Sequence, residues 1–400
     1  MPSQSSTLLL CAFCAVLPVL LVLSTASLPV ALGVAAILAI WAARRDGIAW
    51  ALPREPLVWL CLLLLLWAAL ASLWSFRVER ALLLALRLGA IGLAGGILIA
   101  VALRLQPAER ARAARWLCIG FAFGLAIFLF ERLTGGLLHN LSLEPGRERT
   151  TLSVLNRAAT GLALLVWPVT AALYRGAAGR LAWLMPPALL GLLFFYESQA
   201  AVIGAAAGCA ILLFTQLSLR AAMMTAGGIL LVAILAGPLI ADWAPVPSVY
   251  ESGWIAYSAK HRLHVWDFAA DRIFERPLFG WGFDSSHKMP NMGVQPFEGD
   301  NRVIPAHPHN AVLQIWLELG LVGALIALAL LLSVWRLIGR LSGFDQAAAV
   351  ALLVAGFAVA CISYGIWQSK WIATLIALGL VVVVSRGERP QVPEGTSGAP

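Results

Sequence analysis

The sequence predicts an all-α polytopic membrane protein with about 12 transmembrane helices and one large, partly helical outer loop. Of the 400 residues, 61% are hydrophobic and only 12% are charged, against about 25% charged residues in soluble domains. The mean hydropathy is +0.86. A soluble chain this apolar would expose large apolar patches and aggregate, so the solvent of this protein is expected to be a lipid bilayer.

Twelve apolar stretches of about membrane-spanning length follow one another along the chain. Residues 1–6 carry no basic side chain, so the first stretch is interpreted as a span and not as a cleaved leader. The expected spans are 7–24, 27–43, 57–75, 81–103, 116–133, 158–174, 181–196, 199–217, 222–240, 310–336, 346–364 and 368–385.

Arginine sets the expected orientation, because it makes up all but three of the 28 basic residues. Fourteen arginines against five acids lie in one alternating set of connections and in the tail up to residue 389. The positive-inside rule makes that set cytoplasmic. With an even number of spans, both termini are then expected on the cytoplasmic side and the long polar loop on the outer side.

Four regions follow from this topology. Nine spans occupy 1–240, the outer loop occupies 241–308, three spans occupy 309–385, and a disordered cytoplasmic tail occupies 386–400. A loop this long in a compact protein is usually functional. Apolar spacing within the loop predicts a helix from Trp254 to Phe274, after which Gly280 and Gly282 permit a tight turn.

His309 is the first candidate for chemistry, because it stands where the outer loop enters the tenth span. An imidazole with a pKa near 6.5 suits a proton acceptor at neutral pH. The alternative is a histidine that caps the helix or binds interfacial water. The helix continues through Glu318 to Gly320 and Gly323, and such small residues permit close approach of another helix.

Outer arginines are the second candidates, because guanidinium groups bind phosphates with several charge-assisted hydrogen bonds. Arg262 lies in the outer loop within a stretch rich in histidine and aromatic residues. Arg80 and Arg87 are one heptad apart in the fourth expected span, on nearly the same helix face. The alternative for both is that they extend to the outer lipid headgroups.

Three acids in or beside spans support a rival hypothesis. Glu131, Glu197 and Glu318, together with Arg87, fit the proton or ion path of a small-anion transporter. They fit equally well as paired polar groups that tie helices together. For a transporter, most of the outer loop would be dispensable.

Metal, nucleotide and nucleic-acid chemistry are not expected. The pairs His261/His264 and His307/His309 lack a further ligand at fixed spacing and a nearby cysteine. The chain contains no phosphate-binding loop of the G-x-x-x-x-G-K-[ST] type, no G-x-S-x-G and no H-E-x-x-H. It also has no long Lys/Arg run, so we expect no metal, no cofactor and no nucleic-acid partner.

The stretch His309-Asn310-x-x-Leu313-Gln314-x-x-x-Glu318-x-Gly320-x-x-Gly323 resembles the signature of the O-antigen ligase and polymerase superfamily. The upstream Arg262 and the Pro277-x-x-Gly280-x-Gly282 turn are similar to that family's pattern, and so is Asn156-Arg157 at the sixth span. The resemblance covers roughly 150–330. It departs at Ser198-Gln199, where many members have Ser-Arg, so Arg157, Arg80 or Arg87 are candidates to replace that arginine as donor ligands.

The resemblance implies a ligase of the bacterial inner membrane that works at the periplasmic face. It implies glycan transfer from undecaprenyl diphosphate to lipid A-core, with inversion and without a metal. His309 and Arg262 are then the expected catalytic residues, Arg157, Arg87 and Arg80 bind the donor diphosphate, and Asn310 and Glu318 support the site. The alternatives within the superfamily are an O-antigen polymerase and a protein O-oligosaccharyltransferase.

Overall fold

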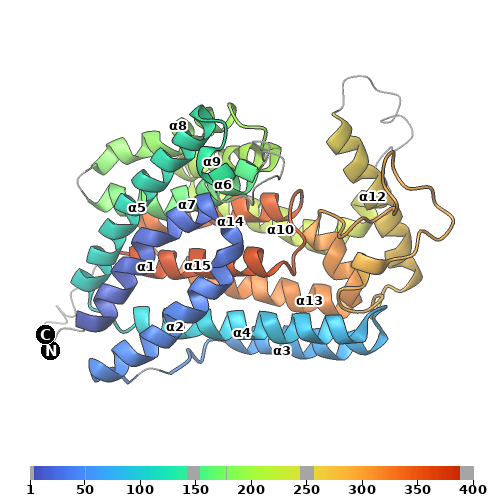
Figure 1. Ribbon diagram of the computed structural model, residues 1–400, viewed down its shortest axis with the longest axis horizontal. Helices are drawn as coiled ribbons and strands as arrows, with labels where there is room; N and C mark the ends of the chain where they lie inside the picture. The colour runs from blue at the N-terminus through green and yellow to red at the C-terminus, as the bar shows by residue number, and fades with distance from the viewer. Residues whose placement is uncertain (1–3, 50, 142–153, 177, 244–255, 388–400) are drawn as a thin grey trace, which may run out of the picture.

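The computed structural model describes residues 4–49, 51–141, 154–176, 178–243 and 256–387. These residues form helices and connecting loops, and none of them is in a strand. The predicted all-α membrane fold is therefore confirmed. Residues 388–400, most of the expected disordered tail, lie outside the described residues. The α-helices are α1 (Gln4–Leu23), α2 (Leu28–Arg45), α3 (Pro56–Ala71), α4 (Val78–Ala102), α5 (Pro107–Leu133), α6 (Leu137–Leu141), α7 (Leu155–Arg175), α8 (Met185–Leu193), α9 (Gln199–Leu217), α10 (Leu219–Asp242), α12 (Tyr257–Glu275), α13 (Ala311–Gly339), α14 (Gly343–Ala360) and α15 (Ser369–Ser385) (Figure 1).

Ten helices in the described part of the chain are long and apolar enough to cross a membrane. Two shorter apolar helical stretches, Gly179–Leu193 and Ser369–Ser385, coincide with two of the twelve expected spans. A short apolar helix reaches across a bilayer only where the bilayer thins or where neighbouring groups cover its ends.

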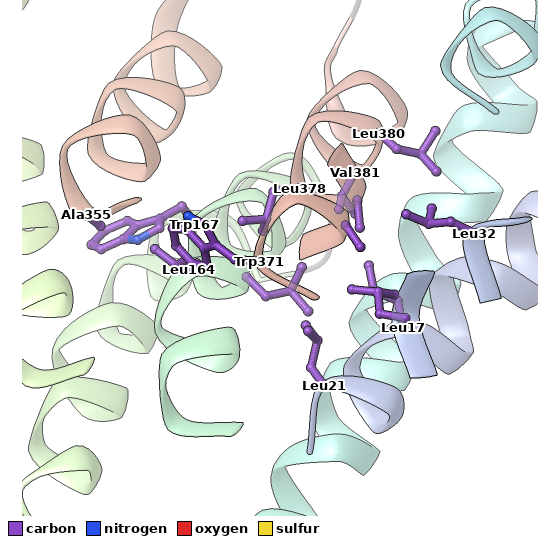
Figure 2. Packing of buried hydrophobic residues seen from close by; sticks show 14 of the residues in the cluster. Leu17, Leu21, Leu32, Leu164, Trp167, Ala355, Trp371, Leu378, Leu380 and Val381 are labelled. Atoms are coloured by element: carbon purple, nitrogen blue, oxygen red, sulfur yellow. The ribbon is translucent and has the colours of Figure 1, made fainter. Parts of the chain in front are cut away.

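Helix α7 lies at the centre of the bundle and packs against α1, α5, α9, α14 and α15. Its middle turns, including Leu164 and Trp167, are fully buried. Figure 2 shows these two side chains beside Ala355 of α14, with Trp371, Leu378 and Val381 of α15 nearby. A helix apolar on all sides is expected at such a position.

Small residues let the helices approach closely, as expected for membrane packing. A Cβ atom on Gly120 of α5 would lie 2.2 Å from the carbonyl oxygen of Ala15 in α1. A Cβ atom on Gly208 of α9 would lie 2.2 Å from the Trp167 ring. The spaced glycines of α5 and α9 therefore serve helix packing.

Helix α12 stands at one end of the molecule, opposite the connection between α2 and α3 (Figure 1). It packs against α10 and α13 through a second apolar cluster that includes Val265, Phe268 and Leu317. Because α12 covers most of the helix expected at 254–274, its position follows the apolar spacing in the sequence. The cluster fixes α12 against the first turns of α13.

Helix α13 is interrupted at Gly320, which has φ 63° and ψ −161°. The loop after α12 inserts at this break. The Trp281 and Gly282 N–H groups donate to the carbonyls of Leu317 and Glu318, and the Leu321 N–H donates to Pro277. The backbone groups released by the break are thereby satisfied, as backbone within a membrane protein requires. Gly320 thus admits a loop and not, as expected, another helix.

The expected span 346–364 ended too late, because α14 begins at Gly343 and ends at Ala360. Residues 361–368 form a loop between α14 and α15. The sequence stays apolar beyond Ala360, so hydropathy does not mark the end of α14. The end is explained by the packing of the following loop against α13. This loop is important for the candidate site, since it contacts His309.

Candidate active site

His309 is held in one orientation by its backbone and by its ring. Its φ of 56° is in the left-handed region, which a residue with a side chain adopts where its surroundings fix it. The ring Nδ1 lies 2.8 Å from the Ser363 carbonyl oxygen. A carbonyl only accepts, so Nδ1 carries the proton and the lone pair of the neutral ring is on Nε2.

The environment keeps His309 neutral. Burial lowers the pKa of His309 below its ordinary value of 6.5, and the positive charge of Arg262 lowers it further. No protein group among the described residues is hydrogen-bonded to Nε2. A neutral imidazole with a free Nε2 is the form that accepts a proton.

His307 supports this arrangement. The His309 N–H donates to Nδ1 of His307 over 3.2 Å, and Nε2 of His307 lies 3.0 Å from the Gln368 side-chain amide. Burial, together with the neighbouring His309 and Lys370, lowers the pKa of His307 to about 3. His307 is therefore uncharged at neutral pH and acts as an acceptor for the His309 backbone.

Arg262 lies on α12 with its guanidinium half-buried. Its Nη1 donates to the Ser258 carbonyl over 3.0 Å, whereas its buried Nε–H has no hydrogen-bond partner. Burial lowers the pKa of Arg262, and no ion pair joins it to a described carboxylate. A buried cation with an unused donor is stabilised by an anion.

Several hydrogen bonds hold α12 beside His309. Trp266, one turn after Arg262, donates from Nε1 to the Pro308 carbonyl over 2.8 Å. The His261 ring is 6.4 Å from the His309 ring, and its Nε2 lies 2.8 Å from Asp300. Arg262 and His309 are thus fixed on neighbouring elements although 47 positions separate them along the chain.

The turn before α9 also reaches this site. Ser258 of α12, whose carbonyl accepts from Arg262, donates its hydroxyl to the Gln199 side chain over 3.2 Å. Gln199 occupies the position where the resemblance leads one to expect arginine. The neutral side chain of Gln199 is therefore linked to Arg262 through Ser258. This turn adds no second positive charge near Arg262.

Glu318 is fully buried and ties three segments together. Its Oε2 accepts from the Asp284 N–H over 2.7 Å and from Trp367 Nε1 over 2.8 Å. Its Oε1 accepts from Ser286 and from Gln314. Four donors suit a carboxylate.

Gln314 completes the link from Glu318 to His309. Its side-chain oxygen accepts from the Ile366 N–H over 2.9 Å. Trp367 and Ile366 are thereby anchored to α13, and they fix the loop that supplies the Ser363 carbonyl. Glu318 is in this way a positioning residue for His309.

Asn310 caps α13. Its side-chain oxygen accepts from the N–H groups of Val312 and Leu313, at 3.0 and 3.2 Å. Such a cap satisfies the free donors of the first turn. Its supporting role is therefore to begin the helix that immediately follows His309.

The other three candidate arginines are placed differently. Arg80 forms a 2.7 Å ion pair with Asp284, while 43% of its side chain stays exposed. Arg87 is exposed on α4. Arg157 lies with Tyr364 and Lys370, and the charge of Arg157 acts on both. Their assignment to the donor diphosphate stays a prediction.

Two histidines of the loop are hydrogen-bonded to other protein groups: the His261 ring to Asp300, and the His264 ring to the Gln295 carbonyl. Within the described ranges, no group of three or more His, Cys, Asp or Glu side chains is arranged to hold a metal ion.

The acids of the transporter hypothesis lie in separate places. Glu131 is buried and bonded to His139 and to the Leu138 N–H. Glu197 is exposed in the turn before α9. Glu318 accepts from four donors, so Glu131 and Glu318 act as local structural groups.

Sequence reasoning missed the loop between α14 and α15. Ser363 contributes a backbone carbonyl, which no side-chain pattern reveals. Trp367 and Lys370 lie in an apolar context that resembles an ordinary span boundary. The one available signal was Lys370, one of only three lysines in the chain.

The fold is that of a membrane protein. At one end it carries a neutral histidine that can accept a proton and a half-buried arginine that can bind an anion. Residues 187–328 match the family model described as O-Antigen ligase. A protein of Rickettsia typhi described as "putative polysaccharide ligase" is 28% identical over 283 residues, which cover 69% of this chain and 68% of that protein. A protein of Rickettsia conorii with the same description is 27% identical over 263 residues, covering 64% and 63%.

These comparisons support the resemblance of the chain to the O-antigen ligase superfamily. The matched region spans about two thirds of the length of these relatives. The similarity to this family supports ligase-like activity on polysaccharides in general, and the many apolar helices indicate a multi-pass membrane protein.

Proposed function

We propose that this protein transfers O-antigen glycan from undecaprenyl diphosphate to a sugar hydroxyl of lipid A-core. The proposal places the protein in the inner membrane of a bacterium, with both termini in the cytoplasm and the site at the periplasmic face. The observation that carries it is the pairing of His309, whose Nε2 is free to accept a proton, with the half-buried Arg262, whose Nε–H lacks a partner.

His309 would act as the general base. Its Nε2 takes the proton of the acceptor hydroxyl while that oxygen forms a bond to the anomeric carbon. The bond from that carbon to the diphosphate oxygen breaks, and undecaprenyl diphosphate leaves. A single displacement inverts the anomeric centre. The Ser363 carbonyl stabilises the imidazolium that forms, because it accepts from Nδ1 in both charge states.

Arg262 would stabilise the leaving diphosphate, where negative charge grows in the transition state. Its unused Nε–H supplies a charge-assisted hydrogen bond from a site that already excludes water in part. The diphosphate ester is already activated for displacement, so the proposed reaction uses no nucleotide and no metal.

Reconstitution tests this function. The purified protein in proteoliposomes would receive lipid-linked glycan and lipid A-core, and the products would be separated by gel and analysed by mass spectrometry. We expect glycan joined to lipid A-core and free undecaprenyl diphosphate in equal amounts. Lengthening of the lipid-linked glycan without joining to lipid A-core would instead identify a polymerase and contradict the proposed acceptor.

A further inference from the structure

A small basic pocket lies between α1, α7 and α15, away from α12. Its wall includes Leu21, Gly161 and Trp371, and its polar groups include Arg157, Tyr364 and Lys370. Figure 2 shows Leu21 and Trp371 within the apolar packing on which this pocket rests. The pocket is built from the end of α1 and the beginnings of α7 and α15, which the predicted topology places on the outer side.

Two positive charges, those of Arg157 and Lys370, line this pocket. Arg157 is exposed and Lys370 is half-buried, and the charge of Arg157 acts on Lys370. Among the described residues, no ion pair joins either of them to a carboxylate. Adjacent like charges repel each other, so an anion between them would be stabilised by both.

Tyr364 forms the wall beside the two cations. Its ring stacks on Trp371 with centroids 4.5 Å apart and an interplanar angle of 5°. Its hydroxyl is hydrogen-bonded to Thr160, another residue of the pocket lining. The two cations therefore supply the charge-assisted hydrogen bonds to the oxygens of a phosphate group.

The size of the pocket limits its ligand. Its enclosed part has room for about one water molecule, so it is a shallow depression that cannot enclose a sugar. A phosphate group would lie at its open mouth, beside the exposed Arg157. The apolar Leu21 and Trp371 beside the cations suit the chain region of a lipid.

We infer that Arg157, Lys370 and Tyr364 form a second anion site, separate from Arg262, that binds the phosphate group of a lipid headgroup. The site goes beyond the transfer reaction, because its contacts need neither a glycan nor His309. For Arg157, this inference replaces the predicted contact with the donor diphosphate. It lies on the same loop as Ser363, since Tyr364 is the next residue in the chain.

Lipid binding to the full chain tests this inference. The protein would be reconstituted in nanodiscs of phosphatidylcholine with a minor fraction of phosphatidic acid, and native mass spectrometry would count the bound lipids of each kind. We expect phosphatidic acid to be enriched on the wild type. The double substitution Arg157→Gln/Lys370→Gln is expected to lower that enrichment about tenfold. The variant Arg157→Lys/Lys370→Arg keeps both charges and is expected to retain it.

Matched controls separate this site from general charge and from the transfer site. Arg220→Gln/Arg336→Gln removes two exposed charges elsewhere and should leave the enrichment unchanged. Arg262→Gln and His309→Ala should also bind phosphatidic acid like the wild type, so failure of the proposed function would not remove this binding. Unchanged enrichment in Arg157→Gln/Lys370→Gln, or an equal loss in Arg220→Gln/Arg336→Gln, would overturn the inference.

Inorganic phosphate distinguishes the two sources of the ligand. We expect it not to displace phosphatidic acid, because the apolar wall also holds the lipid. Displacement by inorganic phosphate at concentrations that leave bulk lipid binding intact would overturn the lipid assignment in favour of the free anion.

Discussion

At the residue scale, one hydrogen bond decides what His309 can do. Because Nδ1 donates to a backbone carbonyl, only Nε2 can take a proton, and the low-dielectric surroundings favour the neutral ring that a base requires. Arg262 contributes twice. It lowers the pKa of His309, and its unused N–H offers a place for an anion.

The pH dependence of transfer should report this neutral ring. Activity requires unprotonated His309, so kcat/KM should rise with pH through the pKa of that residue, with a midpoint below pH 6.5. Arg262→Gln removes a positive charge that lowers this pKa, so the acidic limb should move upward, toward 6.5. Histidine ¹⁵N NMR would follow the same titration where the residual activity of the variant is low.

A matched variant on the same helix checks the sign of this shift. Arg272 pairs with Glu275, and its charge does not contribute to the pKa of His309. Arg272→Gln should therefore leave the acidic limb in place. A downward shift in Arg262→Gln, or an equal shift in both variants, would show that the charge of Arg262 does not act on His309.

At the element scale, the break in α13 joins the site to the membrane domain. The loop 277–282 fills the gap at Gly320, and Glu318, two residues earlier, anchors the loop that holds His309. The sequence predicted the types of these elements, because apolar spacing and the Asn310 cap are local signals. It predicted α13 as continuous, since the insertion of a distant loop leaves no trace in helical periodicity.

Gly320→Ala should destabilise the fold. The added Cβ would lie 2.4 Å from the Leu278 carbonyl oxygen at a φ of 63°, and strain of this kind costs about 1–3 kcal/mol. Gly339→Ala is the control on the same helix, because nothing lies within 4 Å of its Cβ position. Thermal unfolding in one detergent should show a lower midpoint for Gly320→Ala alone, and equal midpoints would disprove the requirement for the break.

Glu318→Gln should mainly reduce kcat and change KM for the donor little. The new amide NH₂ would replace an oxygen that accepts two hydrogen bonds, and each unsatisfied buried group costs about 1–3 kcal/mol. The loop carrying Ser363 would then loosen, and the orientation of His309 with it. Steady-state kinetics would measure this effect, and an unchanged kcat would refute the positioning role of Glu318.

At the scale of the whole molecule, composition was enough to predict a helical membrane protein, because a bilayer leaves few other solutions for such an apolar chain. The convergence of Arg262 and His309 was predictable only through the family resemblance. The grouping of Arg157 with Lys370 was not predictable, since it depends on how α7 and α15 pack. Distances between spans are set by tertiary contacts and not by hydropathy.

The predicted orientation is testable by cysteine labelling from outside the cell membrane. In a variant with its six native cysteines replaced, Glu298→Cys lies in the exposed loop beside α12, and Arg104→Cys lies at an exposed position in the connection between α4 and α5. A membrane-impermeant maleimide should label position 298 in intact spheroplasts and position 104 only after lysis. The reverse pattern would place the candidate site on the cytoplasmic side.

The most direct test of the central claim is single-turnover glycan transfer by His309→Ala and Arg262→Gln in proteoliposomes saturated with both lipid substrates. Loss of the base should slow transfer at least about a hundredfold, and loss of the guanidinium should have an effect of about the same order. Both variants should retain the wild-type unfolding midpoint within a few degrees. Transfer at near the wild-type rate by either variant would contradict the claim that these two side chains act together on a lipid-linked diphosphate.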